Sequence, residues 1–387
     1  MRNDRETVAI ASCTKYEEDE VRRAMDVCLQ GAGGLDWAKP GMTVGIKVNL
    51  VSGMAPEKAG TTHPALVKEL ASRLCERGCK VIIGDSPGGI YNAHYVKAIY
   101  HACRMEDALV EGASLNEDFS VREANFPEAV SIKTFQYTGW LDSCDALINF
   151  AKFKTHAMMS MSCSVKNLFG TIPGITKPEY HMRFPETQAF SNVMVDLNEY
   201  FRPVLNIIDA VEGMEGNGPT NGTPTQVGKL LASTSPYALD LVCAAMMGLG
   251  SEDVPTIKAA MSRRIGPRDL GQVDLVGEDS IERLSEFRLI TSRMSTTFGG
   301  HGIKAAFSPL LRWVLATKPQ VRRGECIGCA KCRNICPAHA IEMKDKLPVI
   351  DREKCIHCFC CQEFCPKGAM KVAQNPIGRI VRRINTI

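Results

Sequence analysis

Cysteines recur at a fixed spacing near the C-terminal end of this 387-residue chain. Residues 326–337 read C-x2-C-x2-C-x3-C-P, and residues 355–366, 29 positions further on, repeat the pattern. Bacterial-type ferredoxin modules hold four-iron clusters with this spacing, because two-residue gaps let three thiolates reach three corners of one cubane. The repeat therefore predicts a duplicated unit that binds two [4Fe-4S] clusters.

The fourth cysteine of each half is predicted to reach the cluster of the other half, since three residues and a proline set it apart from its own triad. A structural zinc site, the alternative, explains two C-x2-C pairs but neither the third cysteine nor the duplication. Cys360 is predicted to be a spectator, although exchange with a ligand stays open. The predicted ligands are Cys326, Cys329, Cys332 and Cys365 for the first cluster, and Cys355, Cys358, Cys361 and Cys336 for the second.

The distribution of cysteines also bears on the compartment. Nine of the seventeen cysteines lie between Cys326 and Cys365, and the other eight are scattered between Cys13 and Cys243 without metal-binding spacing. Clustered cysteines in a chain that starts MRNDRE, with no apolar leader, indicate metal binding rather than disulfides and predict a cytoplasmic protein. No apolar run reaches the ~18 residues of a membrane span.

Charge is unevenly placed along the chain. Residues 318–387 hold 14 Lys and Arg and 6 Asp and Glu, a net +8, so residues 1–317 carry −5 of the total +3. Part of the positive charge would offset anionic clusters held by thiolates. This balance argues against disorder and against a strongly basic nucleic-acid binder. The charge therefore requires no basic partner site, and we expect no nucleic-acid partner. The ferredoxin-like module predicts a redox partner protein, and the lack of a long apolar run predicts no membrane span.

Apolar runs alternate with helical patterns over the first 290 or so residues, which predicts an α/β body with a parallel, doubly wound sheet covered on both faces. One helix start is well marked, because His63 or Thr62 can cap it and Pro64 suits its first position. The predicted strands are Thr7–Ala11, Thr43–Asn49, Lys80–Gly84, Ala129–Phe135, Ala146–Phe150, Val204–Asp209 and Lys229–Ser233. The predicted helices are Glu17–Gln30, Pro64–Arg77, Ala93–Cys103, Thr187–Tyr200, Tyr237–Gly248 and Val254–Arg264.

These patterns divide the chain into four parts. Residues 1–298 form the α/β body, which could comprise two lobes, and residues 299–318 form a connector. Residues 319–375 form the ferredoxin-like 2[4Fe-4S] domain, and residues 376–387 form a basic tail whose role stays open.

Polar residues follow several predicted strands of the body. Asp85 lies in the turn GDSPGG after one strand, and His156 closes KFKTH after another. Lys166 and His181 come a little further on in a glycine-punctuated segment. Ligands of an open α/β sheet bind outside the carboxyl ends of its strands. We therefore predict an active pocket with these four residues around an anionic substrate or cofactor; a simple turn at Asp85 and ordinary surface positions for the others are the alternatives.

Several motifs of the body resemble the family called domain of unknown function 362. They are GDSPG at 84–88, KFKTH at 152–156, KNLFG at 166–170, PG at 173–174 and DAVEGMEGNGP at 209–219. The resemblance covers roughly residues 7–372, and members often end in a two-cluster ferredoxin module. It implies the fold and the module but no activity, since the family has no settled reaction.

The segment from His156 onward also resembles the nickel-pincer lactate racemase family. His156 is followed ten residues later by Lys166 and then by Pro-Gly-Ile at 173–175. In that family the lysine tethers the pincer cofactor and a later histidine binds nickel, which makes His181 the candidate ligand here. Thr155 replaces a proline, and the second catalytic histidine of that family has no counterpart. The resemblance therefore implies a shared fold and site location rather than shared chemistry.

Taken together, the sequence predicts an iron–sulfur electron-transfer oxidoreductase. Its ferredoxin-like tail would exchange electrons with a site in the body that acts on an unidentified, anionic small molecule. Two alternatives stay open: a non-enzymatic electron carrier or cluster-assembly factor, and a racemase-like enzyme with accessory clusters. The residues do not show whether the body binds a further cofactor such as nickel or flavin.

Overall fold

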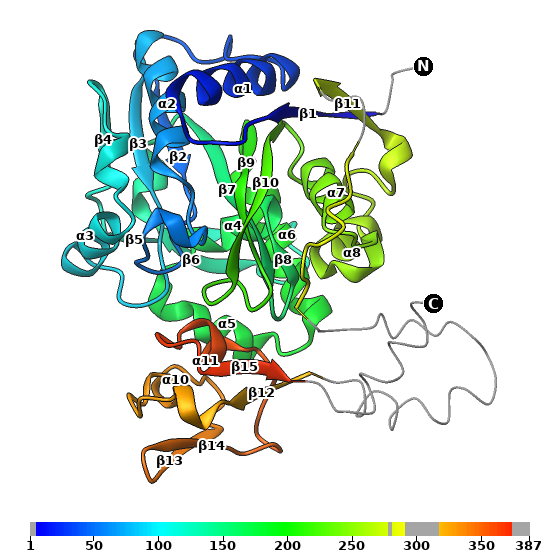
Figure 1. Ribbon diagram of the computed structural model, residues 1–387. Coiled ribbons are helices and arrows are strands. Elements are labelled where there is room, and N and C mark those ends of the chain that lie inside the picture. The colour runs from blue at the N-terminus through cyan, green and yellow to red at the C-terminus, as the bar shows by residue number, and fades with distance from the viewer. Residues whose placement is uncertain (1–4, 278–280, 291–316, 374–387) are drawn as a thin grey trace.

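The computed structural model describes residues 5–277, 281–290 and 317–373. A nine-stranded sheet forms the centre of the body, in the order β11-β1-β10-β9-β7-β2-β3-β4, with β8 paired to β7 (Figure 1). Its strands are β1 (Glu6–Ser12), β2 (Thr43–Lys47), β3 (Lys80–Gly84), β4 (Ala113–Leu115), β7 (Ala146–His156), β8 (Ser160–Ser162), β9 (Leu205–Glu215), β10 (Thr223–Ser233) and β11 (Val273–Gly277).

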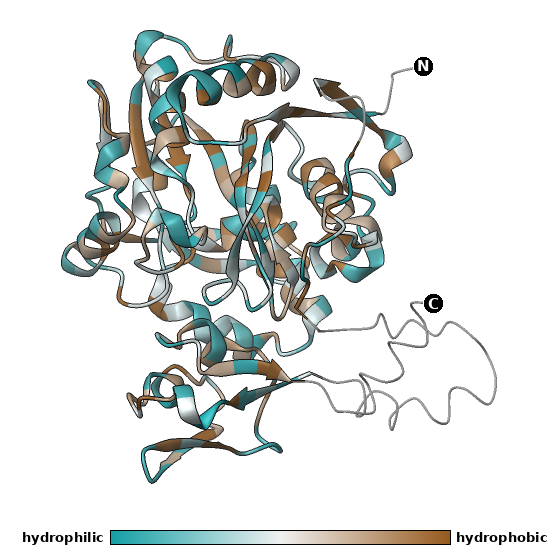
Figure 2. Ribbon diagram, viewed as in Figure 1, coloured by the Kyte–Doolittle hydropathy of each residue, from teal (hydrophilic) through white to brown (hydrophobic). Residues whose placement is uncertain are grey.

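Helices cover both faces of this sheet. One face packs on α1 (Glu18–Gly31), α2 (Pro64–Glu76) and α3 (Ala93–Ala102). The other packs on α4 (Ser164–Asn167), α6 (Thr187–Phe201), α7 (Pro236–Met246) and α8 (Pro255–Ser262). Figure 2 shows the apolar residues concentrated toward the sheet and hydrophilic residues on the outer side of α1. The predicted α/β class with helices on both faces is confirmed.

The sheet is not wholly parallel. The strands from β9 through β7, β2 and β3 to β4 run parallel, and so do β1 and β11, but β10 is antiparallel to both of its neighbours. The short loop between β9 and β10 explains this, because a parallel neighbour would need a longer crossover connection.

Helix boundaries agree closely with the sequence prediction. The observed α2 begins at the predicted Pro64, and the His63 side chain accepts a hydrogen bond from the backbone N–H of Ala65 at 3.2 Å, as an N-cap should. The predicted strand at 129–135 is wrong. Residues 126–133 connect a separate hairpin of β5 (Val121–Asn125) and β6 (Thr134–Thr138), and only the last two residues of the predicted strand lie in β6.

Two central strands extend past their predicted ends, and β10 begins at Thr223 rather than at Lys229. The strand β7 continues to His156 rather than ending at Phe150, and β9 continues to Glu215 rather than ending at Asp209. All eleven residues of β7 are buried, including its charged ones. Residues 152–156 thus continue the strand and do not form the predicted loop. Their polar side chains suggested an exposed segment, but buried polar partners satisfy them.

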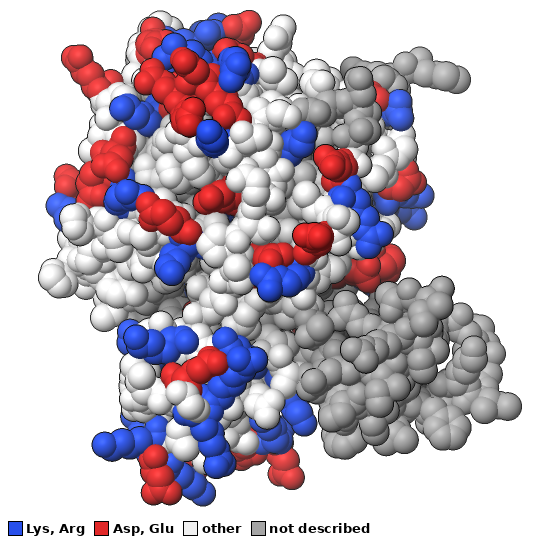
Figure 3. All heavy atoms as spheres, viewed as in Figure 1, with Lys and Arg blue, Asp and Glu red and all other residues white. Residues whose placement is uncertain are grey.

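The C-terminal module packs below the body, with α11 against the region of α5 (Lys177–Arg183) (Figure 1). It contains two two-stranded sheets and two short helices that carry cysteines, and its surface is rich in Lys and Arg (Figure 3). Its elements are β12 (Lys318–Val321), α10 (Lys331–Asn334), β13 (Ile341–Lys344), β14 (Leu347–Ile350), α11 (Cys360–Glu363) and β15 (Met370–Ala373). The predicted tail at 376–387 and the connector up to residue 316 lie outside the described residues. Among the helices of the described part, none is long and apolar enough to cross a membrane.

Candidate functional site

The eight motif cysteines line two separate cavities of the module. The first, of about 360 Å³ including the open space at its mouth, is lined by Cys326, Cys329, Cys332 and Cys365. The second, of about 330 Å³ measured in the same way, is lined by Cys336, Cys355, Cys358 and Cys361, with Cys360 beside them. The fourth cysteine of each half thus lies with the triad of the other half, as the spacing predicts.

These cavities fit a four-iron cluster better than a zinc ion. Zinc needs its ligands at about 2–2.3 Å from one point. Within residues 5–277, 281–290 and 317–373, no three His, Cys, Asp or Glu side chains are grouped so that they could hold one metal ion. Four thiols around a cavity can instead hold the larger [4Fe-4S] unit. The assignment of individual ligands stays a prediction.

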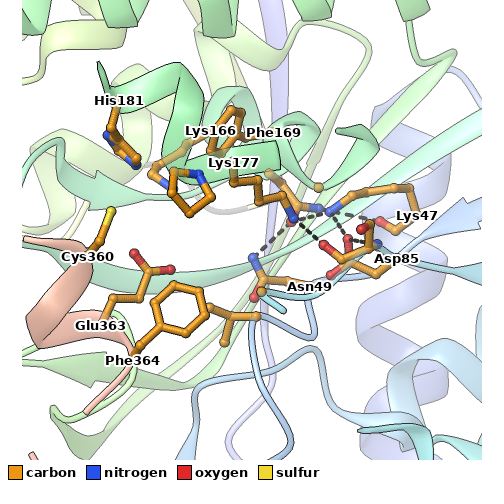
Figure 4. A pocket seen from close by; sticks show the side chains of 16 residues that line it. Lys47, Asn49, Asp85, Lys166, Phe169, Lys177, His181, Cys360, Glu363 and Phe364 are labelled. Atoms are coloured by element: carbon orange, nitrogen blue, oxygen red, sulfur yellow. Dashed lines mark hydrogen bonds and ion pairs between the residues drawn. The ribbon is translucent and has the colours of Figure 1, made fainter. Parts of the chain in front are cut away.

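A pocket lies between the body and the module (Figure 4). It has a volume of about 590 Å³, including the open space at its mouth. The body contributes residues from the ends of β2 and β3, from α4 and from α5, and the module contributes residues of α11 and the position after it. The side chains that shape it most are Lys47, Asn49, Asp85, Lys166, Phe169, Lys177, His181, Cys360, Glu363 and Phe364.

A buried ion pair forms the inner wall of this pocket. The Lys47 ammonium lies 2.8 Å from an Asp85 carboxylate oxygen and donates to Asn167 Oδ1 at 2.9 Å. The backbone N–H groups of Leu50 and Ser86 donate to the same carboxylate, at 2.7 and 2.9 Å. Burial lowers the pKa of Lys47, and the Asp85 charge opposes this shift. Asp85 is therefore fully engaged, which suits a fixed counter-charge.

Two further lysines face the cavity. Lys166 makes no hydrogen bond or ion pair with any described residue; its ammonium lies 5.7 Å from the centre of the Phe169 ring. Lys177 donates to the backbone carbonyl of Ser86 and lies 5.9 Å from the same ring. Burial lowers the pKa of Lys166, and it lowers that of Lys177 to about 7. These amines can bind an anion, and Lys177 can exchange a proton near neutral pH.

The two predicted histidines take different places. His181 lines the pocket and stacks on Phe190, with ring centres 4.3 Å apart, and burial lowers its pKa to about 3, so it is neutral. His156 is buried in β7 and is not part of the pocket lining. Its Nδ1 accepts backbone N–H bonds of 3.1 and 3.2 Å, and its Nε2 lies 3.9 Å from Glu363 of the pocket wall. The structure thus brings Asp85, Lys166 and His181 together in the pocket lining. His156 lies outside that lining, next to the pocket residue Glu363.

Comparison with known proteins gives a family for the chain. Residues 44–245, more than half of its length, match the family described as "Domain of unknown function (DUF362)". The chain belongs to the DUF362 family. Residues 325–369 match the 4Fe-4S dicluster domain, which supports iron–sulfur clusters as cofactors of this DUF362 protein.

Two further comparisons give one sequence relative of this DUF362 protein and one solved structure with a slight likeness to it. The thylakoid-associated protein sll1697 of Synechocystis is 29% identical over 268 residues, which cover 67% of this chain and 80% of that protein. A structure of the lactate racemase apoprotein from Thermoanaerobacterium thermosaccharolyticum has a TM-score of 0.39 at 14% identity, over 64% of this chain and 59% of that chain. That likeness is too slight to carry an argument about the site, so racemase-like chemistry stays an untested alternative.

Sequence reasoning missed several pocket residues of the DUF362 body and the module. Lys47 interrupts the apolar run Ile46-Lys47-Val48, and a lysine inside a buried strand was a detectable sign of a polar partner. Lys177 had no such pattern around it. Glu363 and Cys360 reach the pocket through the packing of the module on the body, which no local pattern encodes. Cys360, predicted to be a spectator, lines both the pocket and the second cysteine cavity.

Proposed function

We propose that this DUF362 protein is an iron–sulfur oxidoreductase that acts on a small anionic molecule held between its body and its ferredoxin-like module. One observation carries the proposal: the helix α11 belongs to both sites. Its residue Cys361 lines the second cysteine cavity, Glu363 lines the pocket, and Cys360 lines both. A molecule in the pocket would thus lie one side chain away from the second cysteine set.

The charges of the pocket favour an anion. Its lining includes Lys47, Lys166 and Lys177 against Asp85 and Glu363. Lys47 and Asp85 are paired with each other at 2.8 Å, so two lysines and one carboxylate remain to face a ligand. Lys166 is partly buried and has no ion-pair partner among the described residues, which is unfavourable for a cation, and an anionic ligand would relieve this cost.

The proposal gives the groups around the ligand the following roles. The clusters, when bound, accept and donate single electrons, and two of them match a two-electron change in a substrate. Lys166 and Lys177 would bind and orient the anion, and Lys177 would hold or release a proton near neutral pH. The rings of Phe169 and Phe364 would restrict water at the same place. The division of the chain into a body and a module with separate roles is part of this proposal.

The proposal is tested on anaerobically purified protein. We expect about eight irons and eight acid-labile sulfides per chain, from two four-iron clusters. Inorganic phosphate serves as the anion probe, and any co-purifying molecule is identified by mass spectrometry. Phosphate should alter the electron paramagnetic resonance (EPR) signal of one reduced cluster, and Lys166→Ala and Lys177→Ala should weaken that response at least tenfold.

Lys68→Ala, which removes an exposed lysine of the body, serves as the matched control and should leave the response unchanged. An unaltered response in both pocket variants, with full cluster content, would favour an electron carrier or a cluster-assembly factor instead. The cytoplasmic location stays a prediction, since the Synechocystis relative is described as thylakoid-associated.

A further inference from the structure

The two cysteine cavities differ in what lies beside them. Both are lined by module residues alone, but the second shares Cys360 with the pocket at the body, whereas the first, lined by residues from Val321 to Met370, shares none with it. All seventeen cysteines lie in the described ranges, and Cys329, in the first set, is the one that is exposed. The first cavity is therefore the part of the module from which electrons can be exchanged with another protein.

An apolar tip stands at this exposed edge. Ile327, which lines the first cavity, is 60% exposed, among the most exposed large apolar side chains of the described residues. Gly328 follows it with φ at +69°, and a side chain there would meet the backbone of Lys346 at 3.0 Å. This glycine turn presents Ile327 and Cys329 to solvent on either side of it.

Unpaired cations surround the tip. Lys331 and Lys367 line the first cavity, and both are exposed. Arg323, close in the chain, and Lys346, which lies beside Gly328, are exposed as well. None of the four forms an ion pair with a described residue. The neighbouring Glu325 is already paired with Arg322 at 3.1 Å and Lys371 at 3.4 Å.

The net charge of the whole module is also positive, like that of the exposed edge. Residues 317–373 hold 11 Lys and Arg and 6 Asp and Glu, a net +5, and Figure 3 shows basic side chains over much of its visible face. Thiolate-held clusters would add negative charge in the interior. The four cations of the edge point to solvent instead, where they can meet a partner.

We propose that this edge, formed by Ile327, Cys329, Arg323, Lys331, Lys346 and Lys367, docks a small acidic electron-carrier protein. The inference rests on the proposed function, since it names the partner that would supply that site. The reduced carrier loses one electron and the module gains it, with no bond made or broken. Small contacts with a charged rim are typical of such transient encounters, in which rim charges set the association rate.

The test uses charge reversal with a matched control. Arg323→Glu/Lys346→Glu changes the docking edge at two positions that do not line the first cysteine cavity, and Lys68→Glu/Lys133→Glu makes the same change in net charge on exposed lysines of the body. The probe is a purified acidic [2Fe-2S] ferredoxin. Binding affinity by calorimetry and the rate of cluster reduction by stopped-flow absorbance are measured at low and moderate salt.

We expect wild type and control to bind the probe with an affinity that falls as salt rises. The edge variant should bind at least tenfold more weakly and be reduced at least tenfold more slowly, while reduction by dithionite stays unchanged in all three. Equal behaviour of the edge variant and wild type, equal losses in the control, or no binding to wild type would overturn the proposal.

A membrane surface is the competing occupant. Vesicles containing phosphatidylglycerol are therefore sedimented with the same proteins. Vesicle binding that is lost in the edge variant, with unchanged ferredoxin binding, would assign this edge to a lipid surface and overturn the proposal. The phosphate response of the pocket is measured in parallel: if it is absent while the ferredoxin data hold, the proposed function fails and the docking edge stands.

Discussion

Cys360 lies where the second cysteine cavity meets the pocket. It lines the second cysteine cavity and the pocket, and its hydrogen bond with Cys358 raises its own pKa and lowers that of Cys358. Cys358 would carry no proton as the thiolate ligand of a cluster, so Cys360 would be the donor of this bond. Hydrogen bonds to cluster sulfurs raise the reduction potential of a cluster. Cys360→Ala should therefore keep the iron content and lower the potential of one cluster, as measured by EPR-monitored redox titration.

Two companion variants complete this prediction. Cys360→Ser keeps a donor and should restore the wild-type potential, and Cys243→Ala, at a buried cysteine of the body, should change neither cluster. Loss of about half of the iron in Cys360→Ala would instead make Cys360 a ligand. Equal shifts of both clusters would indicate a general loosening of the module.

Lys177 predicts how anion binding depends on pH. Burial lowers the pKa of Lys177 to about 7, and the nearby charges of Lys47 and Lys166 lower it as well. The charges of Asp85 and Glu363 oppose this shift. The amine is therefore charged below pH 7 and neutral above it. The affinity for phosphate, measured by calorimetry from pH 6 to 8.5, should fall by up to tenfold per pH unit above 7, once the second ionisation of phosphate is subtracted.

The same titration in Lys177→Gln isolates the contribution of this group. The variant should bind phosphate weakly at all pH values and lack the decrease above pH 7. An undiminished decrease in Lys177→Gln would assign the pH dependence to another pocket group.

At the scale of elements, α7 positions the short helix α4. The Asp240 carboxylate of α7 accepts backbone N–H bonds from Ser164 at 2.6 Å and Val165 at 3.2 Å, which orients the turn that carries Lys166. Burial raises the pKa of Asp240 from 3.8 to about 7. Between pH 3.8 and about 7, the folded state holds a proton that the unfolded state has lost. As the pH rises through this range, the group therefore lowers the free energy of unfolding by about 1.4 kcal/mol per pH unit.

Asp240→Asn should remove that dependence. As the pH rises from 5 to 7, the free energy of unfolding of the variant minus that of wild type should increase by roughly 2–3 kcal/mol. Chemical denaturation at a series of pH values measures this, and the comparison cancels all groups that the two proteins share. A constant difference between the two proteins would show that Asp240 is ionised throughout this range.

The helices were the most predictable elements, because local chemistry marks their ends. The His63 cap and Pro64 at the start of α2 are an example, and the N-cap bond is present. The far half of β7 was not predictable in this way. Lys152 is satisfied there by Asp209 at 2.7 Å and Lys154 by the carbonyl of Gly60 at 2.7 Å, partners that lie far away in the sequence.

In the candidate site too, some residues could be predicted from local sequence patterns and others could not. Lys166 and His181 could be placed in one pocket because both follow the same strand of the sheet. The cysteine sets could be assigned because the crossing is encoded within one duplicated motif. Glu363 belongs to the pocket only because α11 packs against the body, and that contact depends on the tertiary structure of both parts.

At the scale of the whole molecule, a buried glutamine of the module and one loop of the body are joined by several hydrogen bonds. Gln362 of α11 is fully buried, and its Nε2 donates to the carbonyls of Asn217 at 2.9 Å and Gly218 at 3.1 Å. Thr220 and Asn221 of the same loop donate to the carbonyls of Glu363 and Gln362, at 2.7 and 3.2 Å. The glycine-rich segment 216–222 thus fixes the helix that forms one wall of the pocket.

Gln362→Leu removes the amide and leaves two carbonyls of the loop without their donor, at a cost of about 1–3 kcal/mol. Because the cysteine cavities do not include Gln362, the iron content should stay the same. We expect faster hydrogen–deuterium exchange in residues 216–222 and in α11, together with weaker phosphate binding in the pocket. Gln320→Leu, at an exposed glutamine of the same module, is the control and should leave both unchanged. Faster exchange with unaltered phosphate binding would mean that the pocket does not depend on how the module is held.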